Sequence, residues 1–315
     1  MKIVVLDAET LGADLDLSPL KALGRLTVYP NTAPEEISSR IADQNVIVSN
    51  KVKLNESNLK DAAQMQLICL AATGYDCVDT AYCRSRGIGV CNVPGYSTHS
   101  VAQLTVAMAL SLGTHLTEYR SFVHEGSYTR SGTANRLEPV WYELCGKTWG
   151  VIGGGNIGQE VAKIATAMGC HMLMCRRKED PNYETVELDE LCERSDIISV
   201  HVALTEQTRG MVGKAQIDRM KRGAIFINVA RGAVTDEAAL AEAIARGRLG
   251  GLGVDVYTQE PFGEAHPFQQ ILGCSNVCLT PHMAWGSLEA RERCIGVVAE
   301  NIRAFQNGQM RNRVE

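Results

Sequence analysis

The sequence predicts an α/β protein made of two doubly wound parallel-sheet domains. Short apolar runs of strand length alternate with helical patterns along most of the chain, which is typical of βαβ units. A glycine-rich turn joins one such run to an amphipathic stretch near the middle of the chain. The length of 315 residues favours two domains, each able to bury its own core.

The composition is that of an ordinary globular chain, with 45% apolar residues, 21% charged residues and a formal net charge of −5. This balance favours neither a nucleic-acid nor a membrane-surface partner. The eleven cysteines are scattered, form no C-x-x-C pair and mostly lie in apolar runs, so we assign no metal site. The N-terminus has the pattern of a strand rather than a signal peptide, and no apolar segment has membrane-helix length. We therefore expect a cytoplasmic protein.

Residues 1 to about 98 are expected to form a parallel sheet with helices on both faces. The predicted strands are Ile3–Leu6, Leu26–Tyr29, Val46–Val48, Leu67–Leu70 and Gly89–Cys91. The predicted helices lie near Ser18–Leu23, Pro34–Ala42, Asn55–Ala62 and Asp79–Arg86. This segment has no phosphate-binding loop, so we expect a second domain that faces the one with the glycine-rich turn.

A long helix is predicted over His99–Leu112. It is apolar nearly all round, which indicates burial between domains or subunits. The following stretch, Glu118–Glu143, has weak periodicity and several Gly and Ser residues, and we expect an arm or extended loop there. A loop of that length usually has a purpose, and packing on a second subunit is one candidate.

The segment Trp149–Arg177 predicts a strand, a tight turn, a helix and a second strand. Its turn has the spacing G-x-G-x-x-G, with Gly153 for the sharp turn, Gly155 for close approach of a pyrophosphate and Gly158 for helix–sheet packing. The first helical turn, with Asn156 and Ile157, would direct free N–H groups at the pyrophosphate. A glycine turn without a ligand is the alternative, which the surrounding strand–helix–strand pattern disfavours.

The remainder of this dinucleotide-binding domain is expected to bring its sheet to about six strands. The further strands are Ile197–Val200, Ala224–Asn228, Gly251–Val254 and Val277–Leu279, and the helices lie near Leu188–Glu193, Lys214–Met220 and Asp236–Arg246. The last helix, Ser287–Gln306, is long enough to cross back to the first domain. We expect residues 1–98 and 288–315 to form the substrate domain, and residues 99–287 the cofactor domain with a dimerisation arm.

Four polar residues stand just after predicted strands, where ligands of such sheets bind. They are Arg231, Asp255, Glu260 and His282. Each has an ordinary alternative: a surface arginine, a turn or helix cap, an exposed loop carboxylate and a structural histidine, respectively. Together they place a cation, two carboxylates and an imidazole at the edge that carries the glycine loop.

This set suits hydride transfer between a nicotinamide cofactor and a carbonyl. The carbonyl oxygen needs a proton donor, and histidine has a pKa close to neutrality. A carboxylate bound to the other ring nitrogen would fix the tautomer and stabilise the imidazolium. An arginine would pair with a substrate carboxylate and polarise the carbonyl, while the cofactor supplies the hydride.

With these residues in place, the chain resembles the D-isomer-specific 2-hydroxyacid dehydrogenases over nearly its whole length. The resemblance is carried by VIGGGNIG, FINVARGAVTDEAALAEAI, GGLGVDVYTQEP and LTPHMAW. It implies that Arg231 binds the substrate, that Glu260 and His282 form the acid–base dyad, and that Asp255 lies near the nicotinamide carboxamide. It also implies a Rossmann cofactor domain, to which we assign Val229 as a cofactor contact, and a flavodoxin-like substrate domain.

The same resemblance implies a substrate-carboxylate site after the fourth strand of the first domain. In the loop AATGYD the matching positions are Thr73 and Gly74. Lys51 falls where the family often has a basic or polar residue facing the cleft, although a solvated lysine is the alternative. The ending PHMAW, with Trp285, resembles the glycerate, hydroxypyruvate and glyoxylate branch. The family is typically a homodimer built through its cofactor domains, which the long helix and the arm fit.

The main departure from the family concerns cofactor selectivity. The usual acid after the second strand is replaced by Arg176, followed by Arg177 and Lys178. An acid there would bind the ribose 2′-hydroxyl of NAD, whereas arginines should accept a 2′-phosphate, so we expect NADP(H) to be preferred with NAD(H) possible. Ordinary surface cations are the alternative. A smaller departure is Ala203, where the family often has proline.

The leading hypothesis is an NADP(H)-preferring reductase of a small 2-keto acid such as hydroxypyruvate or glyoxylate. The alternative is a cofactor-sensing binding protein of the corepressor type with little turnover. The residues Arg231, Glu260 and His282 do not exclude that alternative, whereas the lack of disordered tails argues against it. A cofactor-dependent pull-down without turnover would favour it.

Overall fold

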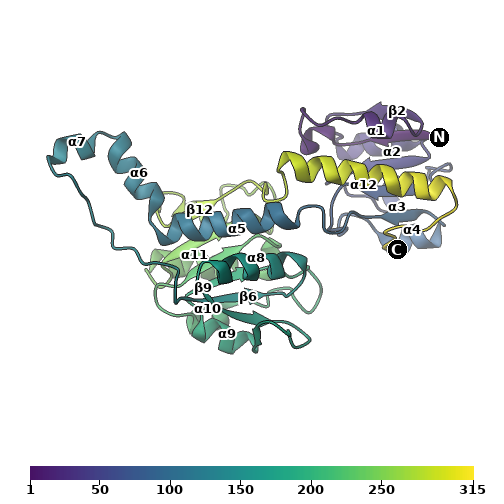
Figure 1. Cartoon of the computed structure of the whole chain (residues 1–315). Helices are drawn as coiled ribbons and strands as arrows, with labels where there is room; N and C mark the ends of the chain where they lie inside the picture. The colour runs from purple at the N-terminus through teal and green to yellow at the C-terminus, as the bar shows by residue number, and fades with distance from the viewer. The chain divides into compact units, whose positions relative to one another are not determined.

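The computed structural model describes all residues 1–315 and divides the chain into two compact units. Unit 1 comprises Met1–Ser97 and Trp285–Glu315, and unit 2 comprises Thr98–Ala284. Each unit is a parallel sheet with helices on both faces, which confirms the predicted fold class (Figure 1). The residues 285–287 belong to unit 1, where Trp285 packs edge-to-face on Tyr96 with 6.3 Å between ring centroids.

The sheet of unit 1 has the strand order β2-β1-β3-β4-β5, and all its pairs are parallel. This is the flavodoxin-like order. The strands are β1 Lys2–Val5, β2 Arg25–Val28, β3 Val46–Ser49, β4 Leu67–Leu70 and β5 Gly89–Cys91. They match the predicted strands to within a residue or two at each end.

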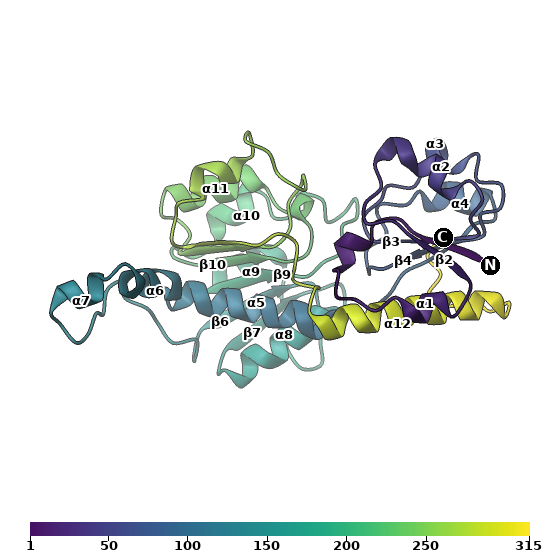
Figure 2. The same cartoon turned by 90° about the horizontal axis from the view of Figure 1, so that it is seen from above.

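Helices cover both faces of this sheet. Figure 2 shows α1 and α12 on one side and α2, α3 and α4 on the other. Their bounds are α1 Ser18–Lys21, α2 Ile37–Ile41, α3 Glu56–Leu59, α4 Thr80–Ser85 and α12 Leu288–Gln306. Because α12 buries Ala290, Cys294, Val298 and Ile302 in the core of unit 1, the end of the chain belongs to the same unit as its beginning.

The sheet of unit 2 has the order β12-β11-β10-β9-β6-β7-β8, so the strand order reverses beside β6. Dinucleotides bind at such a switch point, outside the carboxyl ends of the strands. The strands are β6 Thr148–Ile152, β7 His171–Cys175, β8 Glu184–Thr185, β9 Ile197–Val200, β10 Ile225–Asn228, β11 Gly251–Val254 and β12 Val277–Leu279. The seventh strand, β8, escaped prediction because two residues without an apolar run give no strand pattern.

The helices of unit 2 also form two layers. One face of the sheet is covered by α9 Leu188–Arg194, α10 Lys214–Arg219 and α11 Glu237–Ala245, whose apolar residues join one core cluster. The helices α5 Thr98–Gly113 and α8 Asn156–Ala167 pack on each other, and α5 also lies on β10 and β11. Gly251 and Gly253 make room for Leu112 and Met108 of α5.

The arm after α5 is more ordered than predicted. Instead of one extended loop, the chain forms α6 Leu116–His124 and α7 Ser127–Ser131, and only the following residues to 147 lack regular structure. Neither helix contains a buried residue. Their apolar side chains pack on no core within this chain. Figure 1 shows α6 and α7 projecting from the sheet of unit 2.

No helix combines the length and apolar character needed to cross a bilayer.

Candidate active site

The glycine loop follows β6 and leads into α8. Gly153 has φ +104°, and a side chain there would lie 2.8 Å from the carbonyl carbon of His201. A side chain at Gly158 would collide with the carbonyl oxygen of Gly153, whereas one at Gly155 would meet no protein atom within 4 Å. The helix cap at Gly155 has no side chain to satisfy the first N–H groups of α8. An open space beside free N–H groups fits a pyrophosphate.

A buried polar chain lies behind this loop. The indole Nε1 of Trp149 donates to the Ser199 hydroxyl at 2.9 Å, and Nε2 of His201 lies 2.9 Å from the same oxygen. Burial lowers the pKa of His201 to about 3. The imidazole is therefore neutral at the wall of the loop, and it adds no charge to the pyrophosphate site.

The cations after β7 do not stand alone, because Arg176 pairs with Asp180. The carboxylate of Asp180 is fully buried and accepts hydrogen bonds from Arg176, from Gln159 of α8 and from the N–H of Asn182 at 3.0 Å. Burial would raise the pKa of Asp180, but these bonds produce a net lowering. The next two cations, Arg177 and Lys178, are exposed. Sequence patterns do not reveal the role of Asp180, because its pairing with Arg176 depends on the folded path of the loop.

The Arg231 loop follows β10 and is shaped by a buried asparagine. Asn228 accepts from the N–H of Ala230 at 3.0 Å and donates to the carbonyl oxygen of Arg231 at 2.9 Å. The guanidinium of Arg231 donates to the carbonyl oxygen of Ala230 at 2.8 Å. Val229, between Asn228 and Ala230, is buried.

Gly232 brings this loop against the loop that follows β11. A side chain at Gly232 would overlap the carbonyl carbon of Tyr257 and the nitrogen of Thr258. The N–H of Tyr257 in turn donates to Glu260 at 3.0 Å. The absence of a side chain at Gly232 therefore sets how closely the Arg231 loop approaches the Glu260 loop.

Glu260 and His282 form a hydrogen-bonded pair, with 2.7 Å between the carboxylate and Nδ1. Their side chains keep exposed fractions of 30% and 19%, so the pair is accessible from solvent. His282 has a left-handed backbone with φ 53°, which is uncommon outside glycine. Its N–H donates to the carbonyl oxygen of Thr280 at 3.0 Å.

Asp255 is completely buried and holds the loop that carries His282. Its carboxylate accepts from the Thr280 hydroxyl at 2.6 Å and from the N–H groups of Met283 and Ala284 at 2.8 and 2.9 Å. Burial raises the pKa of Asp255, and the three loop hydrogen bonds oppose that rise. The structure thus gives Asp255 a positioning role in the turn that carries His282.

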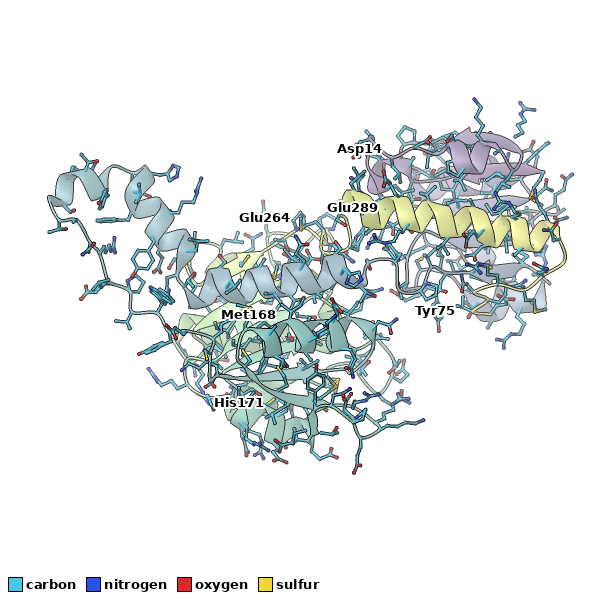
Figure 3. The ribbon with its side chains drawn as sticks, viewed as in Figure 1. Asp14, Tyr75, Met168, His171, Glu264 and Glu289 are labelled. Carbon is cyan, nitrogen blue, oxygen red and sulfur yellow. The ribbon has the colours of Figure 1, made fainter.

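Unit 1 carries the other predicted residues. Thr73 and Gly74 lie in the loop after β4, where the Thr73 hydroxyl donates to the carbonyl oxygen of Val93 at 2.9 Å. Lys51 is exposed, and its N–H donates to the buried carboxylate of Asp7 at 2.7 Å. In Figure 3, the labelled Tyr75 marks the loop after β4, and Glu264 marks the loop after β11.

No group of three or more His, Cys, Asp or Glu side chains is arranged to hold a metal ion.

Comparison with known proteins identifies the class to which this fold and site belong. Residues 106–284 match the family model described as D-isomer specific 2-hydroxyacid dehydrogenase, NAD binding domain. The chain is 36% identical to the hydroxypyruvate reductase of Blautia hydrogenotrophica, with 98% of each chain covered. It is 35% identical to the glycerate dehydrogenase of Methylorubrum extorquens, covering 100% of this chain and 99% of that relative.

A solved structure shares the fold of the whole chain. The acyclic imino acid reductase (Bsp5) in complex with NADPH and D-Arg has a TM-score of 0.87 at 27% identity, with 100% of both chains covered. The chain therefore belongs to the D-isomer specific 2-hydroxyacid dehydrogenase family, which confirms the resemblance seen in its motifs. It is an NAD(P)-dependent oxidoreductase.

The Gly232 contact generates a direct prediction. In Gly232→Ala the new methyl group must push the Arg231 loop away from the Tyr257–Thr258 peptide. We expect kcat/KM to fall on the order of 100-fold, because displacements near 1 Å can cost that much in oriented catalysis. Steady-state kinetics measures the effect, and circular dichroism checks the fold. Gly263→Ala, in open space on the loop after β11, is the matched control. Equal activity of both variants would contradict the prediction.

Proposed function

We propose that this protein is an NADP(H)-preferring D-2-hydroxyacid dehydrogenase that reduces a small 2-keto acid such as hydroxypyruvate or glyoxylate. The observation that carries the proposal is the Glu260–His282 pair at 2.7 Å, in the same unit as Arg231 and the glycine loop. The names of the hydroxypyruvate reductase and glycerate dehydrogenase relatives support the substrate class.

In this proposal His282 is the general acid for reduction and the general base for oxidation. Its Nδ1 faces Glu260, so Nε2 is the ring nitrogen that donates the proton to the carbonyl oxygen. The Glu260 carboxylate holds the imidazole in one orientation and stabilises its protonated form. After the alcohol forms, His282 regains a proton from water. Asp255 maintains this geometry by binding the 280–284 loop and faces the nicotinamide carboxamide, as the family resemblance implies.

Arg231 supplies the substrate's counter-charge. Its guanidinium pairs with the substrate carboxylate and polarises the adjacent carbonyl, which favours hydride arrival at the carbonyl carbon. The hydride itself comes from the bound nicotinamide cofactor. In unit 1, we assign the N–H groups of Thr73 and Gly74 to binding of a substrate carboxylate, and Lys51 and Trp285 to substrate recognition, as the family resemblance implies. We assign unit 1 as the substrate domain on this basis.

The cofactor is held by unit 2. The N–H groups at Gly155, Asn156 and Ile157 bind the pyrophosphate, and the buried Val229 shapes the nicotinamide side. The cations Arg176 and Arg177 bind the 2′-phosphate of NADP(H). Arg176 is aligned along the glycine loop, since its Cδ would lie 2.8 Å from a side chain at Gly154. Because the Asp180 carboxylate neutralises much of the positive charge of Arg176, Arg177 provides much of the selectivity for the 2′-phosphate.

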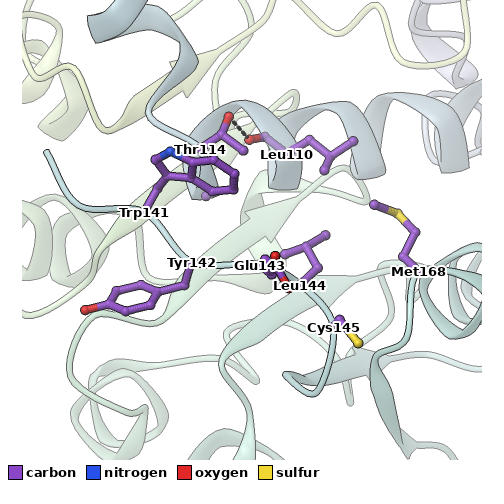
Figure 4. A pocket seen from close by; sticks show the side chains of 9 residues that line it. Leu110, Thr114, Trp141, Tyr142, Glu143, Leu144, Cys145 and Met168 are labelled. Carbon is purple, nitrogen blue, oxygen red and sulfur yellow. Dashed lines mark hydrogen bonds between the residues drawn. The ribbon is translucent and has the colours of Figure 1, made fainter. Parts of the chain in front are cut away.

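The arm is the proposed homodimer contact. The large apolar side chains exposed along it are Leu116, Val123, Tyr128, Leu137, Val140, Trp141 and Tyr142. A monomer rarely exposes so many of them in one segment. At its return to the sheet lies a mainly apolar cavity of about 310 Å³, lined by Leu110, Trp141, Tyr142, Leu144 and Met168 among others (Figure 4). A second copy of this chain would cover both.

The first test addresses the reaction. Purified protein with NADPH and a panel of 2-keto acids should lose absorbance at the nicotinamide band, and His282→Asn should lower kcat on the order of 100-fold or more while retaining cofactor binding. His171→Asn, at the exposed start of β7, is the control and should keep full activity. Absence of turnover with every keto acid and with both cofactors would contradict the proposed function.

Cofactor selectivity is tested by Arg176→Ala/Arg177→Ala. We expect kcat/KM with NADPH to fall on the order of 100-fold, since each lost charge-assisted bond costs about 1.5–3 kcal/mol, and the value with NADH to change little. Arg177→Ala alone leaves Asp180 paired and should show the same bias more weakly. The exposed Arg222→Ala is the control. Equal losses with both cofactors would reject the 2′-phosphate role.

The oligomeric state is tested by light scattering at micromolar concentration. The wild-type chain should have twice the mass of one chain, and Leu137→Asp/Val140→Asp should shift it to a monomer, because a buried unpaired carboxylate opposes association. Met310→Asp, at a side chain 85% exposed in unit 1, should leave the mass unchanged. A monomeric wild type would contradict this assignment.

A further inference from the structure

We propose that Glu237 and His266 form a positioning pair. The pair holds Glu260 at a fixed position relative to the Arg231 loop. The inference rests on the proposed dehydrogenase function, and it assigns a task to two side chains that do not touch the reacting groups. Both are nearly buried, with side-chain exposed fractions of 10% for Glu237 and 7% for His266. A buried carboxylate and a buried imidazole in a globular core require satisfied partners.

Glu237 uses each carboxylate oxygen for a different element. Oε1 accepts the N–H of Thr258 at 2.8 Å, and Oε2 lies 3.0 Å from Nε2 of His266. Glu237 is the first residue of α11, but the cap of this helix is Asp236, which accepts from the N–H of Ala239 at 3.0 Å. Capping of α11 therefore does not explain Glu237, whose contacts all reach toward the Glu260 loop.

The tautomer of His266 follows from its partners. The N–H of Phe268 can only donate, and it lies 3.2 Å from Nδ1, so Nδ1 is the acceptor. Nε2 then carries the hydrogen and donates it to Glu237. The ring also packs against Phe262 and Phe268, with centroid distances of 4.7 and 5.0 Å. His266 is thus a rigid donor that fixes the orientation of the Glu237 carboxylate.

These contacts converge on the two successive peptide units that flank Tyr257. The N–H of Tyr257, in the first unit, donates to Glu260; the N–H of Thr258, in the second unit, donates to Glu237, and Gly232 packs against that second unit. A shift of these two units would move Glu260 away from His282 and would change its spacing from the Arg231 loop. Glu237 is the side chain that ties the second unit to α11, so it transmits the rigidity of the helix to the acid–base dyad.

The experiment compares Glu237→Ala, Glu237→Gln and the wild type. Glu237→Ala should lower kcat on the order of tenfold to a hundredfold, with the KM for NADPH unchanged, because the dyad and not the cofactor site is displaced. Glu237→Gln keeps one oxygen for the N–H of Thr258 but turns its NH2 group toward the Nε2–H of His266, so it should recover only part of that kcat. Glu242→Gln, which removes an exposed pair with Arg246 on the same helix, is the matched control and should equal the wild type.

Hydrogen exchange supplies a readout that does not depend on turnover. In Glu237→Ala, peptides covering 255–262 should exchange about tenfold faster, while those of the sheet keep their protection. Protection lost throughout unit 2, with kcat falling only in proportion to the folded fraction, would show a merely structural residue and overturn the inference. Unchanged kcat and unchanged local exchange would overturn it as well. Failure of the proposed function is distinct, since the wild type itself would then lack turnover.

Discussion

The contact between Gly232 and the Tyr257–Thr258 peptide constrains the geometry of the whole site. β10 and β11 are neighbours in a parallel sheet, so their loops leave the same edge a few ångströms apart. One loop carries the guanidinium and the other carries the carboxylate of the dyad. Because no side chain stands at Gly232, the two backbones meet directly, and main-chain packing sets the spacing between the two loops.

The carboxylates near this edge have different roles because their surroundings differ, although their chemistry is the same. Asp255 is buried under three donors of the 280–284 loop, whereas Glu260 is partly exposed beside the imidazole of His282. A buried carboxylate that accepts several hydrogen bonds from a loop fixes that loop, and an accessible one can respond to protonation of its partner. Asp180 resembles Asp255, because it too is a buried carboxylate. It orients the Arg176 guanidinium close to the glycine loop.

Much of this molecule could be predicted from local sequence patterns. The apolar runs gave the strands, with β8 the exception, and the glycine spacing located the turn between β6 and α8. The arm was predicted less well, because α6 and α7 have apolar residues with no core in this chain to bury them. Asn228, Asp180 and the Glu237–His266 pair left no signal of their own, since each is defined by a partner that only the folded loops bring within hydrogen-bond distance.

The sequence by itself determined that two parallel sheets would form and that polar residues would gather at the carboxyl edge of the second sheet. Strand formation depends on local apolar patterning, and parallel strands necessarily end on the same side. The family resemblance named Glu260 as the partner of His282, but only the tertiary structure shows the physical reason. Asp255 and Glu260 both follow β11, and the choice depends on how the 255–261 loop turns over Gly232 and is tied to α11. Such a choice rests on contacts between segments far apart in the chain, which local patterns do not specify.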